Sequence, residues 1–202
     1  MKEEVIELDT VDKYNKFFKV ETYHPMVTVV DLSKITQPAQ PFTINYGIYA
    51  LFLKDTLCGD ITYGRQPYDY QEGTIVCFAP GQVASIHAQE GTRPTGYGLL
   101  FHPDFIRGTQ LGHDIRNYSF FSYEAREALH LSEEERHTVI DCLHKIDTEL
   151  RRPADKHSRR LITANIGLLL DYCMRFYERQ FTTREASNKD LSLIHISEPT
   201  RL

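Results

Sequence analysis

Short segments rich in apolar and β-branched residues fill the chain from His24 to Phe101. Turn residues separate them about every 8–12 positions, the spacing of a β-barrel or β-sandwich. We therefore expect an all-β first part. The expected strands lie within HPMVTVVDL, FTINYGIYALFLK, DITYGRQPYDY, QEGTIVCFAPG, ASIHAQEG and GTRPTGYGLLF. The mixed-charge residues 1–23 before them are expected to add a loose first strand.

The segment 42–54 is expected to form one long strand that is apolar on both faces. Alternate residues of a strand point to opposite sides, so the two faces can be read from the sequence. One face carries Tyr46, Ile48 and Phe52, and the other carries Tyr49, Leu51 and Leu53. Two apolar faces predict that one side lines the interior of a barrel while the other meets helices.

The pattern changes to a helical one after Phe101. Pro103 and Gly108 bracket a short helical turn in HPDFIRG, and a helix is expected over residues 131–150. Ser132 with Glu135 three positions later forms the sequence signature of a capping box. The apolar positions of this helix recur at helical spacing, as a face packed on the core requires. They are Val139, Leu143, Ile146 and Leu150.

A second helix is expected from about Asp155 to Phe181, with two apolar stripes about 100° apart. The first stripe contains Ile162, Ile166, Leu169, Cys173 and Phe176. The second contains Leu161, Asn165, Leu168 and Tyr172. If the first packs inside the subunit, the second is left for a homodimer, with Asn165 fixing the register. The other interpretation is that both stripes are buried within one subunit.

The predicted fold class is α+β: a cupin-like β-barrel of the jelly-roll type followed by two α-helices. The expected division places the barrel in residues 1–125 and the helical dimerisation segment in residues 126–190. The remaining residues, 191–202, read LSLIHISEPTRL. Codons for the first eleven of them reproduce a transposon-type sequencing adapter. We therefore interpret them as a non-native extension that carries no information on the fold.

The amino-acid composition limits the classes of function that the chain is expected to have. The 202 residues carry a net charge of -5 with 41% hydrophobic residues, which is ordinary for a globular protein and lacks the basic footprint of a nucleic-acid binder. No secretion signal or apolar run of membrane-spanning length is evident, so we expect a cytoplasmic protein without membrane contact. Four scattered cysteines are then expected to be reduced thiols: Cys58, Cys77, Cys142 and Cys173.

A metal centre of the cupin kind is not expected. Such barrels hold their metal with a His-x-His pair, a carboxylate and a further histidine that must converge on the ion. The matching hairpin, TYGRQPYDYQEG, contains no histidine. On the first helix His137, Asp141 and His144 share one face, opposite the apolar stripe, and we interpret them as a solvated polar face. We expect no metal, no cofactor and no catalytic residue.

Aromatic residues on the expected strands favour a small-molecule pocket, because such pockets are mostly apolar with a few placed polar groups. The candidate ligand-binding residues are Tyr46, Phe52, Tyr63, Arg65, Tyr68, Phe78 and His87. The competing interpretation is that these side chains simply fill the barrel.

Several segments between His24 and Asp190 together resemble the N-terminal half of AraC-family transcription regulators, most closely the type found in Bacteroidetes. The most specific are EGTIVCFAPGQ, FHPDFIRGT and RFYERQFTTRE. The resemblance implies a cupin-like sensor and dimerisation barrel, paired helices, and a following domain with two helix-turn-helix units that reads DNA. That domain would begin shortly after Asp190 and is absent from this sequence.

The expected function is therefore that of a non-enzymatic, ligand-sensing and dimerisation domain of a transcription regulator. Its partners would be a second copy of the chain and a small-molecule effector, with DNA contacted only through the missing domain. The alternative is a small cupin-fold enzyme acting on a sugar or an aromatic acid.

Overall fold

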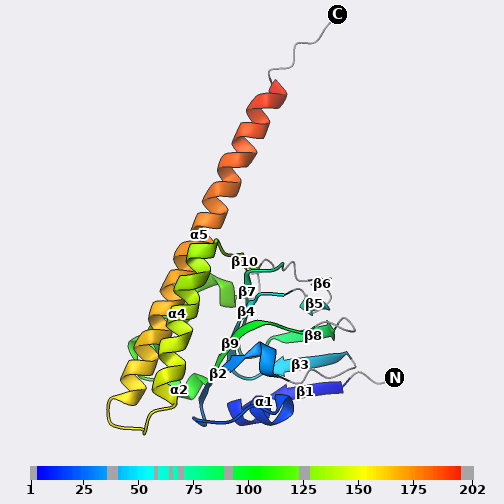
Figure 1. Cartoon of the computed structure of the whole chain (residues 1–202). Helices are drawn as coiled ribbons and strands as arrows, with labels where there is room; N and C mark the ends of the chain where they lie inside the picture. Colours follow the sequence, from blue (N-terminus) through cyan, green and yellow to red (C-terminus); the bar gives the residue numbers. More distant parts are fainter. Residues whose placement is uncertain are drawn as a thin grey trace, which may run out of the picture.

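The computed structural model describes residues 4–35, 41–56, 59–63, 66–67, 71–88, 93–122 and 128–196. Its layers are two facing β-sheets and a set of helices that cover the outer face of one sheet (Figure 1). The α+β class is confirmed, and the sheets form a β-sandwich. Among the described residues, no helix combines the length and apolar character needed to cross a membrane.

Each sheet has five strands among the described residues. In sheet A the spatial order is β1 (Glu4–Leu8), β3 (Phe42–Tyr46), β8 (Val83–Ala88), β5 (Gly59–Tyr63) and β6 (Gln66–Pro67). In sheet B it is β10 (Leu129–His130), β7 (Thr74–Phe78), β4 (Tyr49–Lys54), β9 (Gly96–Phe101) and β2 (Val27–Asp31). Strand β1 runs parallel to β3, and the other described pairs are antiparallel.

The single strand expected over residues 42–54 is wrong, because the chain changes sheets at Gly47. β3 ends at Tyr46 in sheet A and β4 begins at Tyr49 in sheet B. The backbone N–H of Gly47 donates to the Leu8 carbonyl at 2.8 Å, and a Cβ at position 47 would lie only 2.9 Å from Asp9 Cα. A residue without a side chain therefore permits this corner.

The two faces predicted for this segment are nevertheless confirmed. One set of side chains belongs to the apolar core between the sheets: Tyr46, Ile48 and Phe52. The other set belongs to the core between sheet B and the helices: Tyr49, Leu51 and Leu53. Sheet B is thus buried on both sides, which explains why its central strands β4, β7 and β9 are predominantly apolar.

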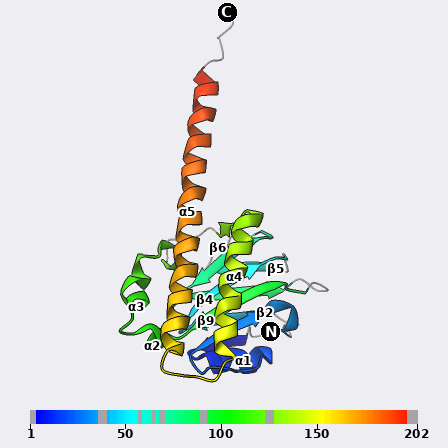
Figure 2. The ribbon, with the colours of Figure 1, turned by 60° about the vertical axis from the view of Figure 1, so that its left-hand side comes forward.

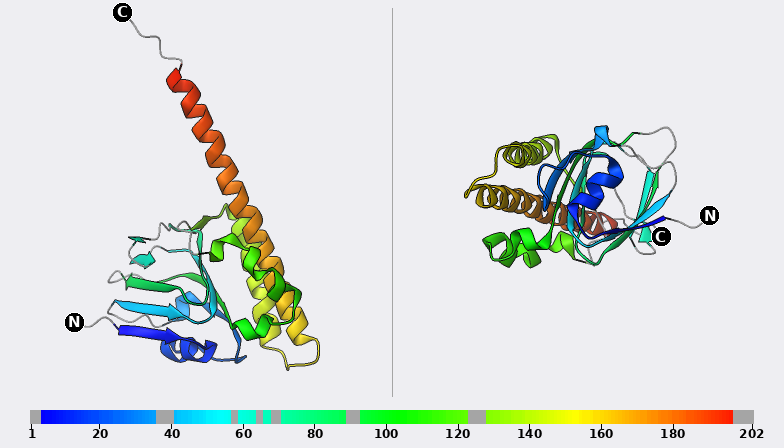
Figure 3. Two further views of the ribbon diagram at one scale, coloured as in Figure 1. Left: turned by 180° about the vertical axis from the view of Figure 1, so that it is seen from behind. Right: turned by 90° about the horizontal axis from the view of Figure 1, so that it is seen from below.

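The N-terminal segment contains a helix that the sequence prediction missed. α1 (Val11–Phe18) follows β1, with Thr10 Oγ1 accepting from the backbone N–H of Lys13 at its start. Lys19 ends it in the left-handed conformation, at φ 56°. Val11, Tyr14 and Phe18 face the core between the sheets, so α1 closes the lower end of the sandwich (Figure 3).

The helical layer begins with α2 (Pro103–Ile106), which has Pro103 in its first turn, as predicted. After α3 (Gln110–Asp114), α4 (Glu133–Leu150) starts at the predicted capping box. Glu135 Oε2 accepts from the Ser132 backbone N–H at 2.8 Å, and Ser132 Oγ accepts from that of Glu135 at 3.3 Å. The predicted stripe of α4 is buried. Its members are Val139, Leu143, Ile146 and Leu150.

α5 (Ser158–Ile196) is longer than expected. It lies between α3 and α4 and then extends away from the sandwich (Figures 1 and 2). The end predicted at Phe181 is wrong because neither glycine nor proline occurs again before Pro199, so no helix breaker stops the helix. The helix therefore continues through residues that have no sandwich beneath them.

Candidate functional site

Two features of the described structure have the composition of binding sites: a cavity between the sheets and the outer face of α5. The cavity has a volume of about 40 Å³. Both sheets, α1 and the segment after β2 contribute to its wall. The lining residues are Tyr14, Phe18, Leu32, Ile35, Phe42, Ile44, Tyr46, Phe52, Lys54, Ile61, Phe78 and Ile86.

Three of the predicted ligand-binding residues meet at this cavity. Tyr46 and Phe78 stack with ring centroids 4.5 Å apart, and Phe52 meets Phe78 edge-on at 6.4 Å. Tyr14 of α1 joins them, 6.2 Å from Phe52. Sequence reasoning missed Tyr14 because its helix was not predicted. The helical spacing of Val11, Tyr14 and Phe18 after a capping Thr10 was the available signal.

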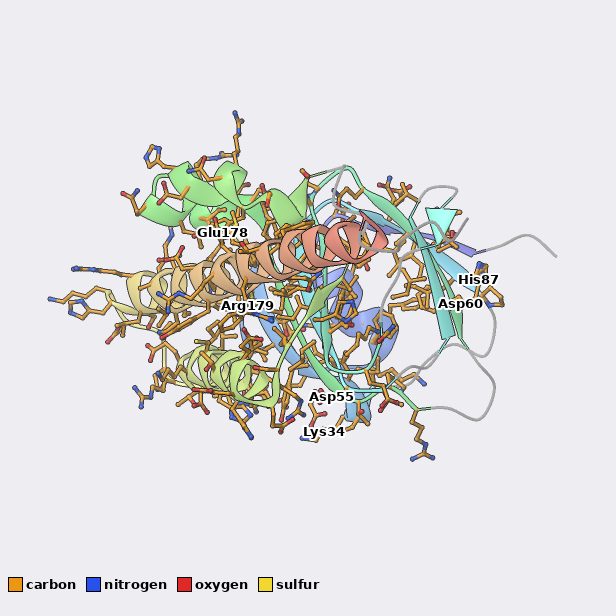
Figure 4. The ribbon with its side chains drawn as sticks, turned by 90° about the horizontal axis from the view of Figure 1, so that it is seen from above. Lys34, Asp55, Asp60, His87, Glu178 and Arg179 are labelled. Carbon is orange, nitrogen blue, oxygen red and sulfur yellow. The ribbon has the colours of Figure 1, made fainter. Side chains whose placement is uncertain are left out.

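The other predicted ligand residues are not brought to the cavity. His87 is exposed on the outer face of sheet A, paired across the strands with Asp60. Figure 4 places both at the side of the molecule away from α5. Ile86, the residue before His87 in β8, faces the cavity instead, because strand side chains alternate. The side chain of Tyr63 and all of Arg65 and Tyr68 lie outside the described residues.

Two tyrosines and one lysine are the described lining residues with polar groups. The side chains of Tyr14 and Tyr46 are only 2% and 1% exposed. Burial raises the pKa of both phenols well above the ordinary value, and the neighbouring Tyr14 adds to the effect on Tyr46. No hydrogen bond joins either hydroxyl to another described residue. Both phenols are therefore neutral at physiological pH and can donate to a bound oxygen.

The outer face of α5 carries the second predicted stripe. Leu161 is 46% exposed and Leu168 is 42% exposed, whereas the members of the first stripe are buried. Asn165 donates from Nδ2 to the Leu161 carbonyl at 2.8 Å, and Tyr172 stacks on Phe176 at 6.0 Å. Within this subunit the structure therefore leaves Leu161 and Leu168 of the second stripe at the surface, while Asn165 and Tyr172 are half-buried and Tyr172 packs against the core.

A groove runs along each side of this stripe. The groove between α3 and α5 has a volume of about 690 Å³, with Ala164, Gly167 and Leu168 among its lining residues. The groove between α4 and α5 has a volume of about 630 Å³ and reaches Leu161 and Asn165. A Cβ added at Gly167 would meet nothing within 4 Å, so the surface is open there. The second stripe of α5 therefore forms a ridge with a groove on either side, and a helix of another chain can pack against such a surface.

The EGTIVCFAPGQ segment holds the sandwich together at a turn. The side chain of Gln82 is only 3% exposed. Its Oε1 accepts from the Ala79 backbone N–H at 2.8 Å, and its Nε2 donates to the Phe121 carbonyl at 3.1 Å. This glutamine therefore fixes the Pro-Gly turn and ties it to the segment that leads toward the helices.

The segments FHPDFIRGT and RFYERQFTTRE, which also carry the resemblance to AraC-type regulators, attach α5 to the sandwich. Beside FHPDFIRGT, Arg159 donates to the carbonyls of Phe105 and Arg107 at 3.0 and 2.7 Å. In RFYERQFTTRE, Gln180 accepts from the His130 N–H at 2.9 Å and donates to the Ala128 carbonyl at 3.3 Å. The roles these geometries support are structural: they hold α5 against the sandwich at both ends of its contact.

The polar face of α4 makes ordinary surface contacts. His137 Nε2 lies 3.3 Å from Glu133 Oε1, and His144 Nε2 lies 3.3 Å from the Tyr97 hydroxyl. The strongest polar contact of this helix is the bidentate pair of Arg136 with Asp55, at 2.8 and 2.6 Å. Among the described residues, no three His, Cys, Asp or Glu side chains gather in the way that a metal ion requires.

Three cysteines lie in the core between sheet B and the helices: Cys77, Cys142 and Cys173. All are free thiols, and burial raises the pKa of each of them. A raised pKa keeps a cysteine in the thiol form, which is a poor nucleophile and a poor metal ligand. The buried thiols therefore act as core residues. Cys58 lies outside the described residues.

No protein-family model and no curated protein sequence matches the chain. The likeness to AraC-type regulators therefore stays a prediction that depends on the residues themselves.

Proposed function

We propose that this chain is the ligand-sensing and dimerisation half of an AraC-type transcription regulator, built on a cupin-like jelly roll. The observation that carries the proposal is the exposed apolar ridge of α5 beside a sandwich that encloses a small apolar cavity. The function is regulatory, not enzymatic.

The order of the strands supports the cupin-like part of this proposal. From β3 to β9 the chain passes repeatedly between the two sheets: β3, β5, β6 and β8 belong to sheet A, and β4, β7 and β9 belong to sheet B. Such alternation is how a jelly roll builds two facing sheets from one chain.

The side chains that line the cavity favour a regulator over a metal-dependent cupin enzyme. Metal ligands in such a barrel must converge on one ion from the inner walls. The described residues that line this cavity include no histidine, cysteine or carboxylate. They offer apolar surface, two phenols and one lysine, which suit the binding of an organic molecule without turnover.

The charges along α5 support pairing between two copies. Lys156, Arg159 and Arg160 lie at one end of the groove between α3 and α5, and Asp114 and Asp171 lie farther along it. A two-fold axis across an antiparallel pair of α5 helices would bring the basic end of each copy to the acidic end of the other. Such self-complementarity is what an isologous dimer interface requires.

In this proposal, ligand binding acts through linkage. A ligand shifts an equilibrium only by its difference in affinity between two arrangements of the protein. Dimerisation then raises the effective concentration of the second DNA-reading unit at its half-site. The contact with DNA belongs to a following domain, in keeping with the net charge of -5 of this chain.

Light scattering on purified protein tests the dimer. We expect about twice the mass of one chain for the wild type and a large shift toward one chain mass for Leu168→Glu, because two buried carboxylates would face the paired helices. Val83→Glu is the matched control, since Val83 is 38% exposed but lies on sheet A. A monomeric wild type at high concentration, or equal effects of both variants, would refute the proposed interface.

A further inference from the structure

The polar groups of the cavity between the sheets limit what it can bind. Ten of its twelve lining residues have no hydroxyl group, and nine of those ten are purely apolar. The exception is Lys54, whose Nζ lies 5.5 Å from the centre of the Phe52 ring. Among the described lining residues, only Tyr14 and Tyr46 can therefore both donate and accept a hydrogen bond.

The two phenols are unusual because their side chains are largely buried while their hydroxyls have no hydrogen-bond partner among the described residues. A buried hydroxyl that lacks a partner costs about 1–3 kcal/mol, so cores rarely keep one without a reason. Asn15 Oδ1 is the one described side-chain atom that is both sealed and unpaired. Since the two hydroxyls also lack partners but are not sealed, each keeps some surface that another molecule can reach.

We propose that this cavity binds a small, uncharged, largely apolar molecule that carries one hydrogen-bonding oxygen, such as a phenol or a compact alcohol. The inference rests on the proposed sensing function and names the ligand class. The apolar body of the ligand would contact the ring and aliphatic side chains. Its oxygen would receive the hydrogen bonds that Tyr14 and Tyr46 do not make within the protein.

A sugar does not suit this site. Each sugar hydroxyl would need partners, and two phenols cannot satisfy four or five of them in an apolar enclosure. A carboxylate is also excluded, because a charge buried among apolar groups requires full pairing. Lys54, the one charged residue of the described lining, is partly exposed, and its Nζ lies 5.5 Å from the centre of the Phe52 ring.

The size of the cavity sets the scale of the ligand. An engineered apolar cavity of about 150 Å³ accepts benzene, whereas this one measures about 40 Å³. A phenol therefore enters only if neighbouring side chains adjust, and its affinity is reduced by that requirement. A molecule of two rings would require a still larger rearrangement of the lining side chains.

Calorimetric titration and ligand-observed NMR with four probes test the proposal. We expect phenol to bind more tightly than toluene, which has the same shape without the oxygen, and we expect no binding of glucose or benzoate. Tyr46→Phe and Tyr14→Phe should each weaken phenol about three- to tenfold and leave toluene unchanged. Tyr49→Phe, on the helix side of sheet B, is the matched control and should change neither.

A measurement without ligand provides a second check. Because the Tyr46 hydroxyl is unpaired, Tyr46→Phe should fold and melt at an equal or higher temperature than the wild type. A clear loss of thermal stability would show that the hydroxyl has a structural partner, and it would overturn the proposal. Phenol binding weakened equally by Tyr49→Phe would overturn it too.

The outcomes separate this inference from the proposed function. Binding of glucose or benzoate that Ile61→Phe abolishes by filling the cavity would overturn the ligand class and leave a sensing cavity. Absence of binding by all four probes would overturn the ligand class, while light scattering would still decide the dimer. A monomeric protein that binds phenol as expected would overturn the dimer alone.

Discussion

Replacing Gln180 by leucine tests whether the side chain of this residue joins α5 to the sandwich. Leucine keeps most of the aliphatic volume, so the change removes hydrogen bonds without opening a large cavity. Two backbone groups lose their partner: the His130 N–H, at 2.9 Å from Oε1, and the Ala128 carbonyl, at 3.3 Å from Nε2. Gln180 is 7% exposed and Ala128 is fully buried, so water replaces these bonds poorly.

The magnitude follows from these two groups. The buried Ala128 carbonyl left unpaired costs about 1–3 kcal/mol, and the less buried His130 N–H costs about 0.5–1.5 kcal/mol. Leucine recovers part of the loss through its more apolar side chain. We expect the free energy of unfolding to fall by about 2–3 kcal/mol, and the melting temperature by about 5–10 °C for a chain of this size.

Urea unfolding at fixed protein concentration measures the loss, and hydrogen exchange locates it. The His130 amide should exchange slowly in the wild type and much faster in the variant. Thr182→Leu is the matched control, because Thr182 lies two residues farther along α5, is exposed and bonds only within α5. If Gln180→Leu loses less than about 0.5 kcal/mol, or no more than Thr182→Leu, the side chain does not join the two parts.

Three further substitutions and one labelling experiment probe other parts of the fold. Gly96→Ala should lower the free energy of unfolding by at least about 2 kcal/mol in urea titrations, since Gly96 has φ 114° and an added Cβ would lie 2.1 Å from the Leu53 carbonyl oxygen. Gly167→Ala should instead raise it by about 0.5–1 kcal/mol, because its Cβ meets nothing and alanine favours helix. The three buried thiols should resist iodoacetamide at neutral pH until urea unfolds the protein, as mass spectrometry of the labelled peptides can show. Asp155 accepts hydrogen bonds at the start of α5, and these lower its pKa from the ordinary 3.8. Ionised Asp155 therefore contributes to the free energy of unfolding above pH 3.8, and this contribution is lost as the pH falls through its lowered pKa. Asp155→Asn should remove this part of the acid sensitivity in acid titrations followed by circular dichroism.

The helical part of the fold could be predicted from local chemistry. The start of α4 is encoded by Ser132 and Glu135, whose side chains make the two hydrogen bonds that their spacing predicts. The burial of Leu143 follows from helical periodicity, whereas the periodicity of the second helix showed two apolar stripes without deciding that Leu168 is exposed. These features depend on residues within one or two turns of each other, so one sequence contains enough information to find them.

The strand and helix boundaries that were wrong depend on distant parts of the chain. The local sequence around Gly47 predicts a continuous strand, and only the contacts of Gly47 with Leu8 and Asp9 reveal the corner. α1 has only eight residues and mixed charge, and it is stabilised by packing between the sheets. The residues that stabilise the corner at Gly47 and those that pack on α1 come from distant parts of the sequence, so local propensity could not identify either feature.

The candidate site could be predicted only in part for the same reason. Tyr46, Phe52 and Phe78 were found because aromatic residues on strands favour a pocket. His87 falls on the other face of its strand, which follows from a register that the sequence alone does not fix. The missing hydrogen bonds of Tyr14 and Tyr46 are a property of the assembled interior, where residues from both sheets and α1 meet.

The uninterrupted course of α5 beyond Gln180 makes the helix a mechanical lever (Figure 1). At about 1.5 Å per residue, Asp190 lies about 15 Å beyond Gln180 along the axis. A tilt of about 10° at Gln180 would therefore displace Asp190 by about 2.6 Å sideways. Angular changes too small to disturb the packing of the sandwich thus become displacements comparable to the length of a hydrogen bond at the far end of the helix.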